Sequence, residues 1–566
     1  MAVLQPILSI VSICAARGVT DAVICPGSRS AALTLAFARH PQITCRVVPD
    51  ERAAAFIAMG IAQQQKRPVA IVCTSGSAGY NFAPAVTEAF FQEIPLLVFT
   101  ADRPAEWIHQ YDGQTIYQSN IFGKHIKEAI ELGADYSHPD AVWFIERSMN
   151  HAINLAVSKP TGPVHLNVPI REPFYPQPDE KFVFSKPRTI EKSPIENSLP
   201  SFEWQKLMSE WEQFDKVLIV SGQYELNEEL QTILYQLSEE FSVPVTGEIL
   251  SNLTSSSFVR HTDIIFQQNH PDLIPDLLIT FGKSVLSKNF KNFLKQNPPF
   301  AHWHIEISEH TIDPFQTLTR QLSVEPLYFF KKLLEDVDFQ SFQNGDDDSK
   351  DESYFTNWQK AEAQALNKIE KFMANQTVFS ELWVVYELTQ HLPSNAYLHL
   401  ANSMVVRYAN LVGKRGNQVF ANRGTSGIDG CTSTAVGAAI ATEQLVILMT
   451  GDVAFFYDRN AFWHAHLPKN LKIILFNNQG GNIFRLIDGP GKLPELEPYF
   501  ETRHTLTAQH LCQEFHLAYF TIHSQSDISK IDSFLTVSET AAILEVFTNP
   551  QTNDEIFKNF KEFLKA

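Results

Sequence analysis

The pattern of hydrophobic positions in the last third of the chain predicts a strand, a helix and a second strand. The apolar run Leu445–Thr450 stops at Gly-Asp, and a second apolar run, Leu471–Phe476, stops at Asn-Asn. The segment between them has the length of a helix and ends at Pro468. Apolar runs separated by a helix are typical of buried parallel strands. We therefore expect Asp452 and Asn478 to emerge together at the carboxyl edge of a sheet, where open α/β folds bind ligands.

The same alternation of apolar runs and helical segments covers most of the 566 residues. It predicts an α/β fold of three doubly wound parallel-sheet domains. Two segments lack this periodicity, one rich in proline and charge and the other reading NGDDDSKDES, and both are typical of linkers. The expected layout is a domain at 1–180, a linker at 181–200, a domain at 201–343, an acidic linker at 344–353 and a domain at 354–566.

Composition limits the classes of partner. Hydrophobic residues make up 44% and charged residues 19% of the chain, as in globular proteins, and the net charge of −18 argues against nucleic acid. No apolar run reaches the length that spans a bilayer. The six cysteines are scattered and form no CxxC pair, which indicates reduced thiols. We expect a cytoplasmic protein with no nucleic-acid partner and no membrane insertion.

The Gly-Asp and Asn-Asn strand ends predict a divalent metal site. Asp452, Asn478 and the backbone carbonyl groups of the turn Gly480-Gly481 offer hard oxygen ligands, which suit Mg²⁺ together with phosphate oxygens. The arrangement resembles the thiamine diphosphate motif, a GDG followed by NN, except that Val453 stands in place of the last glycine. The alternative is an ordinary strand end followed by a turn.

Candidate residues for further chemistry lie at strand-to-helix junctions near the N-terminus. Glu51 stands at the start of a predicted helix, where an acid is commonly favoured by the helix dipole alone. In thiamine diphosphate enzymes an acid after the second strand of the first domain bonds to N1′ of the aminopyrimidine, and Glu51 matches it. The turns 26–30 and 74–79 expose N–H groups that bind anions readily. Arg29, within the first turn, suits a bound carboxylate.

Seven motifs together resemble the 2-succinyl-5-enolpyruvyl-6-hydroxy-3-cyclohexene-1-carboxylate synthase family of menaquinone biosynthesis. They are PGSRS, DERAAAFIAMGIA, TSGSAGYN, TADRP, ANSMVVRYANL, NRGTSGIDG and NNQGGNIF. They lie in the first and third predicted domains, whereas the middle one contributes only FGKSVLSK. The family tolerates an apolar residue after Gly-Asp. The resemblance implies decarboxylation of 2-oxoglutarate and conjugate addition of the succinyl carbanion to isochorismate, with thiamine diphosphate and Mg²⁺, for which Mn²⁺ can substitute.

The resemblance also implies roles for particular residues. Glu51 would be catalytic, and Asp452, Asn478 and Gly480 would hold the metal ion. The implied cofactor-binding residues are Thr74, Ser75, Gly76, Ser403, Ser426, Gly427, Ile428, Gly451, Asp452, Val453, Asn478, Gly480, Asn482 and Ile483. Of these, Ile428 matches the apolar residue that keeps the cofactor bent.

Both substrates of the family are dianions, so the resemblance implies a cationic site within an acidic protein. Ser403 and Arg407 would hold the succinyl-side carboxylate. Arg29, Arg103 and Lys288 would face isochorismate, with Ser28 and Gln114 nearby. Arg423 would lie close to both substrates. Ile483 and Phe484 would line the site.

The resemblance further implies a homodimer or homotetramer, because in this superfamily the cofactor lies between the first domain of one chain and the third domain of another. Two alternatives remain open. One is a different thiamine diphosphate-dependent decarboxylase or carboligase, such as an acetohydroxyacid synthase-like enzyme, whose substrates are mostly less anionic. The other is an inactive homologue that acts as a binding subunit, against which the presence of Glu51, Asp452 and Asn478 argues.

Overall fold

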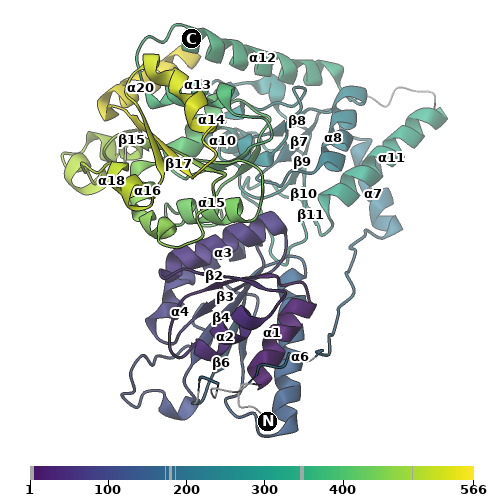
Figure 1. Ribbon diagram of the computed structural model, residues 1–566. Helices are drawn as coiled ribbons and strands as arrows, with labels where there is room; N and C mark the ends of the chain where they lie inside the picture. The colour runs from purple at the N-terminus through teal and green to yellow at the C-terminus, as the bar shows by residue number, and fades with distance from the viewer. Residues whose placement is uncertain are drawn as a thin grey trace.

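The computed structural model describes residues 5–172, 174–176, 181–184, 186–344, 350–486 and 489–565, with side chains omitted for 338–344. It contains three open sheets whose strands are all parallel, and helices cover both faces of each sheet (Figure 1). The predicted fold class is thereby confirmed. Of the expected linkers, residues 185 and 345–349 lie outside the described residues. Within the described ranges, no helix combines the length and apolar character needed to cross a bilayer.

Domain 1, the lower part of Figure 1, is built on a sheet of order β2-β1-β3-β4-β6-β5. Its strands are β1 (Asp21–Ile24), β2 (Thr44–Val47), β3 (Val69–Cys73), β4 (Leu96–Asp102), β5 (Ala129–Glu131) and β6 (Val164–Pro169). Its helices are α1 (Gln5–Ala16), α2 (Ala31–Arg39), α3 (Glu51–Gln65), α4 (Ser77–Asn81), α5 (Ala83–Gln92) and α6 (Pro139–Val157). The chain then rises along one side of the molecule to α7 (Figure 1).

Domain 2 has a five-stranded sheet of order β11-β10-β9-β7-β8. Its strands are β7 (Val217–Ser221), β8 (Val245–Gly247), β9 (Leu277–Phe281), β10 (Ala301–Ile305) and β11 (Arg320–Leu322). Its helices are α7 (Ser201–Trp211), α8 (Glu228–Glu240), α9 (Thr262–Ile265), α10 (Lys288–Gln296) and α11 (Pro326–Asn344).

Domain 3 has a six-stranded sheet of order β13-β12-β14-β15-β17-β16. Its strands are β12 (Tyr397–Leu400), β13 (Gln418–Phe420), β14 (Val446–Gly451), β15 (Leu471–Asn477), β16 (Ala518–Ile522) and β17 (Ala542–Phe547). Its helices are α12 (Glu352–Ala374), α13 (Glu381–His391), α14 (Met404–Val412), α15 (Cys431–Ile440), α16 (Asp452–Tyr457), α17 (Ile483–Leu486), α18 (Gln509–Glu514), α19 (Lys530–Leu535) and α20 (Pro550–Lys565).

The strand–helix–strand unit predicted around Asp452 is present, with a shorter helix than expected. Strands β14 and β15 are direct parallel neighbours, but α16 ends at Tyr457 and a 3-10 turn follows at Arg459–Phe462. The helix ends where the buried carboxylate of Asp458 turns inward to accept the backbone N–H of Ser433 at 2.7 Å and its hydroxyl at 2.8 Å. These bonds to a neighbouring helix replace continuation of α16.

The hydrophobic cores are continuous across the domains. One core joins a face of the domain 2 sheet to a face of the domain 3 sheet, and α12 packs within it. A second core joins domain 1 to the opposite side of domain 3 through α3 and α15, which lie against each other in Figure 1. Domain 3 thus buries apolar surface against both other domains, and this burial is the main favourable term that holds the three together.

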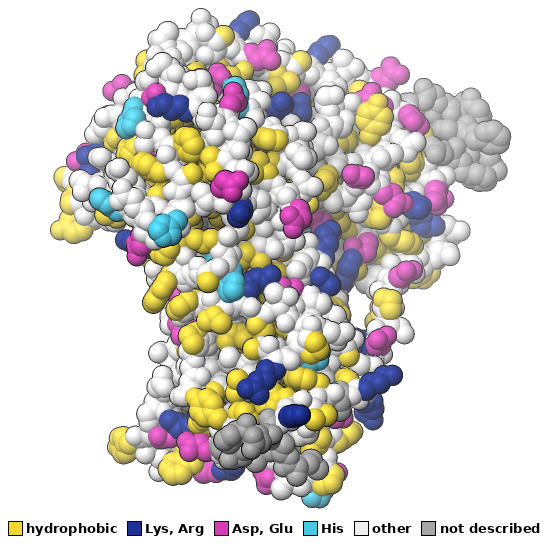
Figure 2. All heavy atoms as spheres, in the orientation of Figure 1, with side chains coloured by type: hydrophobic (Ala, Val, Ile, Leu, Met, Phe, Trp, Pro, Cys, Tyr) yellow, Lys and Arg dark blue, Asp and Glu magenta, His cyan; other side chains and the backbone are white. Residues whose placement is uncertain are grey.

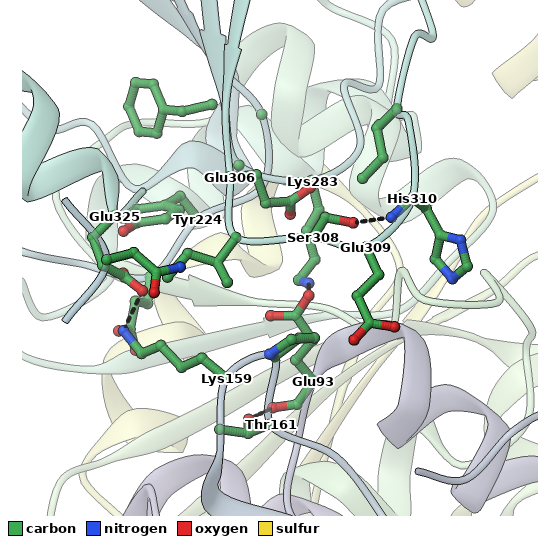
Figure 3. Close-up of a pocket in the computed structure, with 18 of the residues that line it drawn as sticks. Glu93, Lys159, Thr161, Tyr224, Lys283, Glu306, Ser308, Glu309, His310 and Glu325 are labelled. Carbon is green, nitrogen blue, oxygen red and sulfur yellow. Dashed lines mark hydrogen bonds and ion pairs between the residues drawn. The ribbon is translucent and has the colours of Figure 1, made fainter. Parts of the chain in front are cut away.

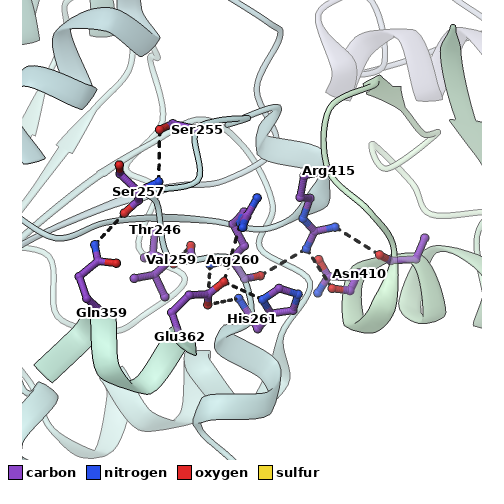
Figure 4. A network of polar contacts seen from close by, with 11 residues as sticks. Thr246, Ser255, Ser257, Val259, Arg260, His261, Gln359, Glu362, Asn410 and Arg415 are labelled. Carbon is purple, nitrogen blue, oxygen red and sulfur yellow. Dashed lines mark hydrogen bonds and ion pairs between the residues drawn. The ribbon is translucent and has the colours of Figure 1, made fainter. Parts of the chain in front are cut away.

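Buried polar groups add specific ties between domains. The carboxylate of Glu88, on α5, accepts the backbone N–H groups of Gly424 and Thr425 in domain 3 at 2.8 and 2.6 Å. Between domains 2 and 3, the carboxylate of Glu362 accepts the N–H groups of Arg260 and His261 and bonds to the His261 ring at 2.7 Å (Figure 4). Because buried carboxylates need such partners, these ties fix how the domains sit together.

Candidate functional site

The turns after β14 and β15 bring Asp452 and Gly480 into contact. Asp452 opens α16, and its Oδ2 accepts the N–H of Gly480 at 3.0 Å while Oδ1 accepts the N–H of Val453 at 2.7 Å. Strand pairing extends to Gly451 opposite Phe476, so the Asn-Asn turn emerges directly beside Asp452. The three residues expected to hold a metal ion therefore lie in adjacent turns at one edge of the sheet, as their positions in the sequence predict.

Unpaired polar atoms at this edge match the donor set of a divalent metal. The Nδ2 of Asn478 donates to Glu381 at 2.6 Å, but its Oδ1 is buried and has no hydrogen-bond partner among the described residues. Both polar side-chain atoms of Asn482 are likewise buried and unpaired within that part of the chain. Because buried polar groups are nearly always paired, such atoms need an external partner. A carboxylate next to a free amide oxygen fits a hard cation such as Mg²⁺.

A histidine with no motif around it also lies beside Asp452. The Nδ1 of His504 accepts the N–H of Leu506 at 3.1 Å, so the neutral ring carries its proton on Nε2, which lies 3.4 Å from Oδ2 of Asp452. The segment before it covers the glycine turn, since the N–H of Gly481 donates to the carbonyl of Glu501 at 2.7 Å. Nothing in the local sequence distinguishes His504 from any loop histidine.

The turns after β12 and β13 are joined by Asn402. Its Nδ2 donates to the carbonyl groups of Asn422 and Gly427, both at 2.6 Å, and its Oδ1 accepts from the guanidinium of Arg423 at 2.9 Å. Ser403 and Ser426 in these turns have φ values of 75° and 60°. Such left-handed conformations are costly for non-glycine residues and are concentrated at functional sites.

Two arginines expected to bind substrate carboxylates lie on or just after these turns. Arg407, on the first turns of α14, donates to the carbonyl of Ser403 at 2.8 Å. Burial lowers the pKa of Arg407, and burial together with the charge of Arg407 lowers the pKa of Arg423. A guanidinium whose ionisation is opposed by burial and by a second positive charge, as in Arg423, would be stabilised by a bound anion.

Lys288 lies in domain 2, exposed at the start of α10. A buried carboxylate, Glu248, connects this helix to α14. It accepts the N–H groups of Leu286 and of Ser287, the latter at 2.6 Å, and it lies 3.5 Å from the Asn410 amide. Burial raises the pKa of Glu248 to about 7. Glu248 thus joins the elements that carry Lys288 and Arg407.

The remaining apolar residues expected at the site lie at two places in domain 3. Ile428 is half-buried in the loop before α15, and Ile483 opens α17 against the core shared by domains 2 and 3. Phe484 follows Ile483 and packs against Phe500, with 5.6 Å between the ring centroids.

In domain 1, Glu51 and the Thr74–Gly76 turn lie at the carboxyl ends of β2 and β3. Glu51 is the first residue of α3, which is capped by Asp50, and its half-buried carboxylate lies 3.5 Å from the Asn81 amide. The N–H of Gly76 donates to Gln118 at 2.7 Å. Within the described chain, the buried hydroxyl of Thr74 has no partner. This turn therefore has a free polar group available for a ligand.

The other domain 1 residues expected to bind substrate are engaged to different extents. Arg29 is buried, donates to the carbonyl of Ile170 at 3.0 Å and lies over the ring of Phe174. Arg103 forms an ion pair with Asp112 at 2.7 Å, and its guanidinium donates two hydrogen bonds to the carbonyl of Gly113. Gln114 has φ of 57° and packs against Gly76, and Ser28 is exposed.

The chain thus carries two clusters, which we call the Glu51 cluster (Glu51 and 74–76) and the Asp452 cluster (Asp452, Asn478 and Gly480). In the described ranges, no hydrogen bond or ion pair connects one cluster to the other. Contacts next to them do cross between the domains, since Asp50 accepts from Asn460 at 2.7 Å. Each cluster is therefore assembled separately, on its own sheet edge.

A cavity of about 1650 Å³ lies elsewhere, between domain 1, the linker and domain 2 (Figure 3). Ion pairs cross it, Lys283 with Glu93 and Lys159 with Glu325, each at 2.7 Å. Arg423 reaches its wall, but none of the residues expected to bind the cofactor does. Its size does not make it the candidate site, because the residues expected to bind the cofactor lie elsewhere.

Sequence reasoning missed Glu381, which contacts the Asp452 cluster, and Glu248, which joins the elements that carry Lys288 and Arg407. Glu381 contacts Asn478 from 97 positions away, and Glu248 contacts Asn410 from 162 positions away. Glu381 reads in the sequence as an ordinary acid in the first turn of a helix capped by Ser380. Only the three-dimensional structure brings such partners together.

Comparisons with known proteins agree with the geometry. The family model described as "Thiamine pyrophosphate enzyme, N-terminal TPP binding domain" matches residues 9–122, and the "Middle domain of thiamine pyrophosphate" matches residues 188–400. Three similar proteins named 2-succinyl-5-enolpyruvyl-6-hydroxy-3-cyclohexene-1-carboxylate synthase come from Cytophaga hutchinsonii, Flavobacterium johnsoniae and Bacteroides fragilis. In that order they are 42%, 39% and 33% identical to this chain. The alignments cover 99%, 98% and 99% of this chain, and the same percentages of the three relatives.

Proposed function

This chain belongs to the family of 2-succinyl-5-enolpyruvyl-6-hydroxy-3-cyclohexene-1-carboxylate synthases, and we propose that it divides the work of that enzyme between the Glu51 and Asp452 clusters. It is a thiamine diphosphate-dependent enzyme of menaquinone biosynthesis that joins a succinyl unit from 2-oxoglutarate to isochorismate, given 42% identity over 99% of its length. The observation that supports assigning separate roles to the two clusters is the buried, unpaired Oδ1 of Asn478 beside Asp452.

The Asp452 cluster is the proposed diphosphate and metal end of the cofactor site. Asp452, the Oδ1 of Asn478 and the carbonyl of Gly480 would hold Mg²⁺, for which Mn²⁺ would substitute, and the metal would neutralise the diphosphate. The other proposed contacts in domain 3 are Ser403, Ser426, Gly427, Ile428, Gly451, Val453, Asn482 and Ile483. Among these, the half-buried Ile428 would press against the cofactor and keep it bent.

The Glu51 cluster is the proposed aminopyrimidine end. When bound, thiamine diphosphate supplies the electron sink for decarboxylation and carbon–carbon bond formation. The Glu51 carboxyl would hold and exchange a proton at N1′ of the aminopyrimidine, and Thr74, Ser75 and Gly76 would offer hydrogen-bonding groups beside it. The half-buried position of Glu51, with one distant amide as its hydrogen-bond contact, leaves it available for this partner.

The cationic residues would bind the two dianionic substrates. Arg407 and Ser403 would hold the succinyl-side carboxylate, and Arg423, tied to Asn402 next to Ser403, would lie close to both substrates. Arg29, Arg103 and Lys288, with Ser28 and Gln114, would face isochorismate, while Ile483 and Phe484 would form an apolar wall. A cationic site in a protein of net charge −18 concentrates an anionic substrate locally.

A second copy of this chain would complete the site. The support is that no hydrogen bond or ion pair joins the two clusters in the part of the chain that the structure describes, and that large hydrophobic side chains stay exposed near each of them. Val47 and Tyr80 are 46% and 55% exposed in domain 1, and Tyr457 and Trp463 are 51% and 55% exposed in domain 3. Figure 2 shows exposed hydrophobic side chains over domain 1 and at its junction with the domain above. The proposed assembly is a homodimer or homotetramer of a cytoplasmic protein, whose six cysteines are all free thiols.

The test is consumption of isochorismate, followed by its absorbance. We expect consumption only when thiamine diphosphate, Mg²⁺ and 2-oxoglutarate are all present, and pyruvate should not replace 2-oxoglutarate. The Glu51→Gln variant should lose roughly 10²- to 10⁴-fold in kcat, the usual contribution of a general acid–base group, while still binding the cofactor. The matched control is Glu228→Gln, because Glu228 is also the first residue of a capped helix but lies exposed in domain 2.

Other results would contradict the proposal in distinct ways. Decarboxylation of a 2-oxoacid without loss of isochorismate would indicate another thiamine diphosphate-dependent carboligase. Absence of both cofactor binding and turnover would indicate an inactive homologue that serves as a binding subunit. Equal activity of the Glu51→Gln and Glu228→Gln variants would remove Glu51 from the mechanism.

A further inference from the structure

We propose that Glu381 is a positioning residue that fixes the side-chain amide of Asn478 so that Oδ1, rather than Nδ2, faces the divalent metal. The inference rests on the proposed metal site and extends it to a residue with no assigned role. Glu381 opens α13 and is only 3% exposed. Its Oε1 accepts from the Nδ2 of Asn478 at 2.6 Å.

Glu381 is itself held from two further sides. The hydroxyl of Thr548 donates to the same Oε1 at 3.1 Å, and the backbone N–H of Glu381 donates to the Oδ1 of Asn553 at 3.0 Å. The Asn553 amide in turn donates to the Thr548 hydroxyl at 3.0 Å. These three residues close a ring of hydrogen bonds, so the position of the Glu381 carboxylate is set by the ends of β17 and α20.

The chemistry of the two groups determines which way the amide points. The Oε1 of Glu381 already accepts from the Thr548 hydroxyl, which itself accepts from Asn553. This oxygen therefore faces Asn478 as an acceptor, and the group of Asn478 opposite it must be its NH₂. The Oδ1 is then directed to the opposite side, where it is buried and, within the described residues, unpaired. An amide NH₂ cannot bind a metal ion, whereas an amide oxygen can. Partners of this kind orient metal ligands and typically change metal affinity 10–100-fold.

Asn477, the residue before Asn478, also donates its side-chain amide to a buried glutamate, but its amide oxygen is not free to bind a metal ion. The Nδ2 of Asn477 donates to Glu545 at 2.6 Å and to the carbonyl of Leu506 at 2.9 Å, while its Oδ1 accepts the N–H of Gln479 at 3.1 Å. Both ends of this amide are therefore used inside the protein. Glu545 is as deeply buried as Glu381, which makes it a matched control in the same domain.

The experiment measures the affinity of the full-length protein for Mn²⁺ in the presence of thiamine diphosphate, by electron paramagnetic resonance of free Mn²⁺. The Glu381→Gln variant should bind Mn²⁺ about 10-fold or more weakly, because a glutamine side chain accepts either orientation of the Asn478 amide. Its kcat should return to within a few-fold of the unchanged protein at saturating Mn²⁺. The Glu545→Gln variant should keep its Mn²⁺ affinity, and thermal unfolding of the metal-free proteins shows whether both variants fold.

A double-mutant cycle separates this positioning role from a general structural one. In an Asn478→Ala background the Glu381→Gln change should have little further effect on Mn²⁺ affinity, because the amide on which it acts is gone. If Glu381→Gln does not fold, Glu381→Asp replaces it, since a shorter side chain withdraws the carboxylate from its 2.6 Å contact. The same loss of affinity is expected.

Three outcomes would overturn the inference: unchanged Mn²⁺ affinity in the Glu381 variant, an equal loss in Glu545→Gln, or the full loss persisting in the Asn478→Ala background. Failure of the unchanged protein to bind Mn²⁺ would instead overturn the metal site itself. The two failures are therefore distinguishable, because only the second affects the unchanged protein.

Discussion

At the scale of single residues, the arginines of the candidate site differ in how much of each guanidinium the protein occupies. Arg407 gives one hydrogen bond to a carbonyl, and Arg423 gives one to Asn402. Arg103 is bound more fully, because Nε and one terminal nitrogen donate to the carbonyl of Gly113, while the other pairs with Asp112. A guanidinium already paired with a carboxylate attracts a substrate carboxylate less strongly.

Replacing Asp112 should therefore alter isochorismate binding. In the Asp112→Asn variant Arg103 stays held by the Gly113 carbonyl but loses the competing negative charge. We expect the KM for isochorismate to fall by roughly two- to five-fold, the scale of a partly exposed ion pair. The KM for 2-oxoglutarate should not change. Steady-state kinetics at two salt concentrations would check this, and a rise in the isochorismate KM would show that Asp112 positions Arg103 rather than competing for it.

Motif residues such as Asp452 and Asn478 could be predicted because the chemistry of their side chains and their places after apolar runs were both visible in the sequence. Their partners could not be predicted in the same way. Glu381 and His504 contact residues far away in the chain or across a turn, and the sequence around each of them carries no motif. Hydrogen-bond partners depend on tertiary packing, which a local pattern does not encode.

At the scale of elements, the crossing of α3 and α15 holds the start of α3, and with it Glu51, against domain 3. The helices approach so closely that a Cβ atom added to Gly437 would lie 2.1 Å from the carbonyl oxygen of Ile57, and one added to Gly60 would lie 2.1 Å from that of Thr434. Both obstacles are backbone atoms of the other helix, which cannot move aside as a side chain could. Glycine is therefore required here by the approach of the helices.

The Gly437→Ala variant should separate these helices and destabilise the protein. Overpacking of this kind costs about 1–3 kcal/mol, so we expect a lower melting temperature, together with reduced turnover because α3 carries Glu51. The matched control is Gly133→Ala, where an added Cβ meets nothing within 4 Å. Calorimetry of both variants would check the prediction, and equal melting temperatures would contradict it.

Elements were predicted well where a long apolar run fixed them. Every residue of β3 and β9 is buried, and both strands follow from continuous apolar segments. The three-residue edge strands β5 and β11 did not stand out, because their burial is incomplete and they leave no clear pattern. The helix after Asp452 was expected to be longer, since the inward turn of Asp458 depends on Ser433 in another helix.

At the scale of the whole molecule, the packing of the domains buries ionisable groups that could not be identified from the sequence. Burial raises the pKa of Glu248, Glu381 and Asp458 to about 7. Burial lowers the pKa of four histidines, to about 4 for three of them and about 3 for the fourth, which are His165, His302, His464 and His399. These two sets act on stability in opposite directions.

The pH dependence of unfolding follows from these shifts. A carboxyl with a raised pKa binds more protons in the folded state, so stability falls as pH rises from its unfolded pKa towards about 7. A histidine with a lowered pKa binds more protons when unfolded, so stability rises with pH until its ordinary value of 6.5. Between roughly pH 4.5 and 7.5 the two effects oppose each other, because an unfolded histidine is still about half protonated at pH 6.5. Towards pH 8 the side chains of Lys127 and Lys472, whose pKa values burial lowers to about 8, add to the histidine effect.

The Glu248→Gln variant isolates the effect of one carboxyl, so between about pH 6.5 and pH 8 the free energy of unfolding of the metal-free unchanged protein should fall relative to that of this variant, measured by urea denaturation at constant ionic strength. The difference arises because one of the three titrating carboxyls is gone from the variant, whereas Glu228→Gln, at an exposed helix start, should follow the unchanged protein. A constant difference between the unchanged protein and the Glu248→Gln variant through this range would show that Glu248 keeps its ordinary pKa, and that its contacts are those of a charged carboxylate rather than of a protonated carboxyl.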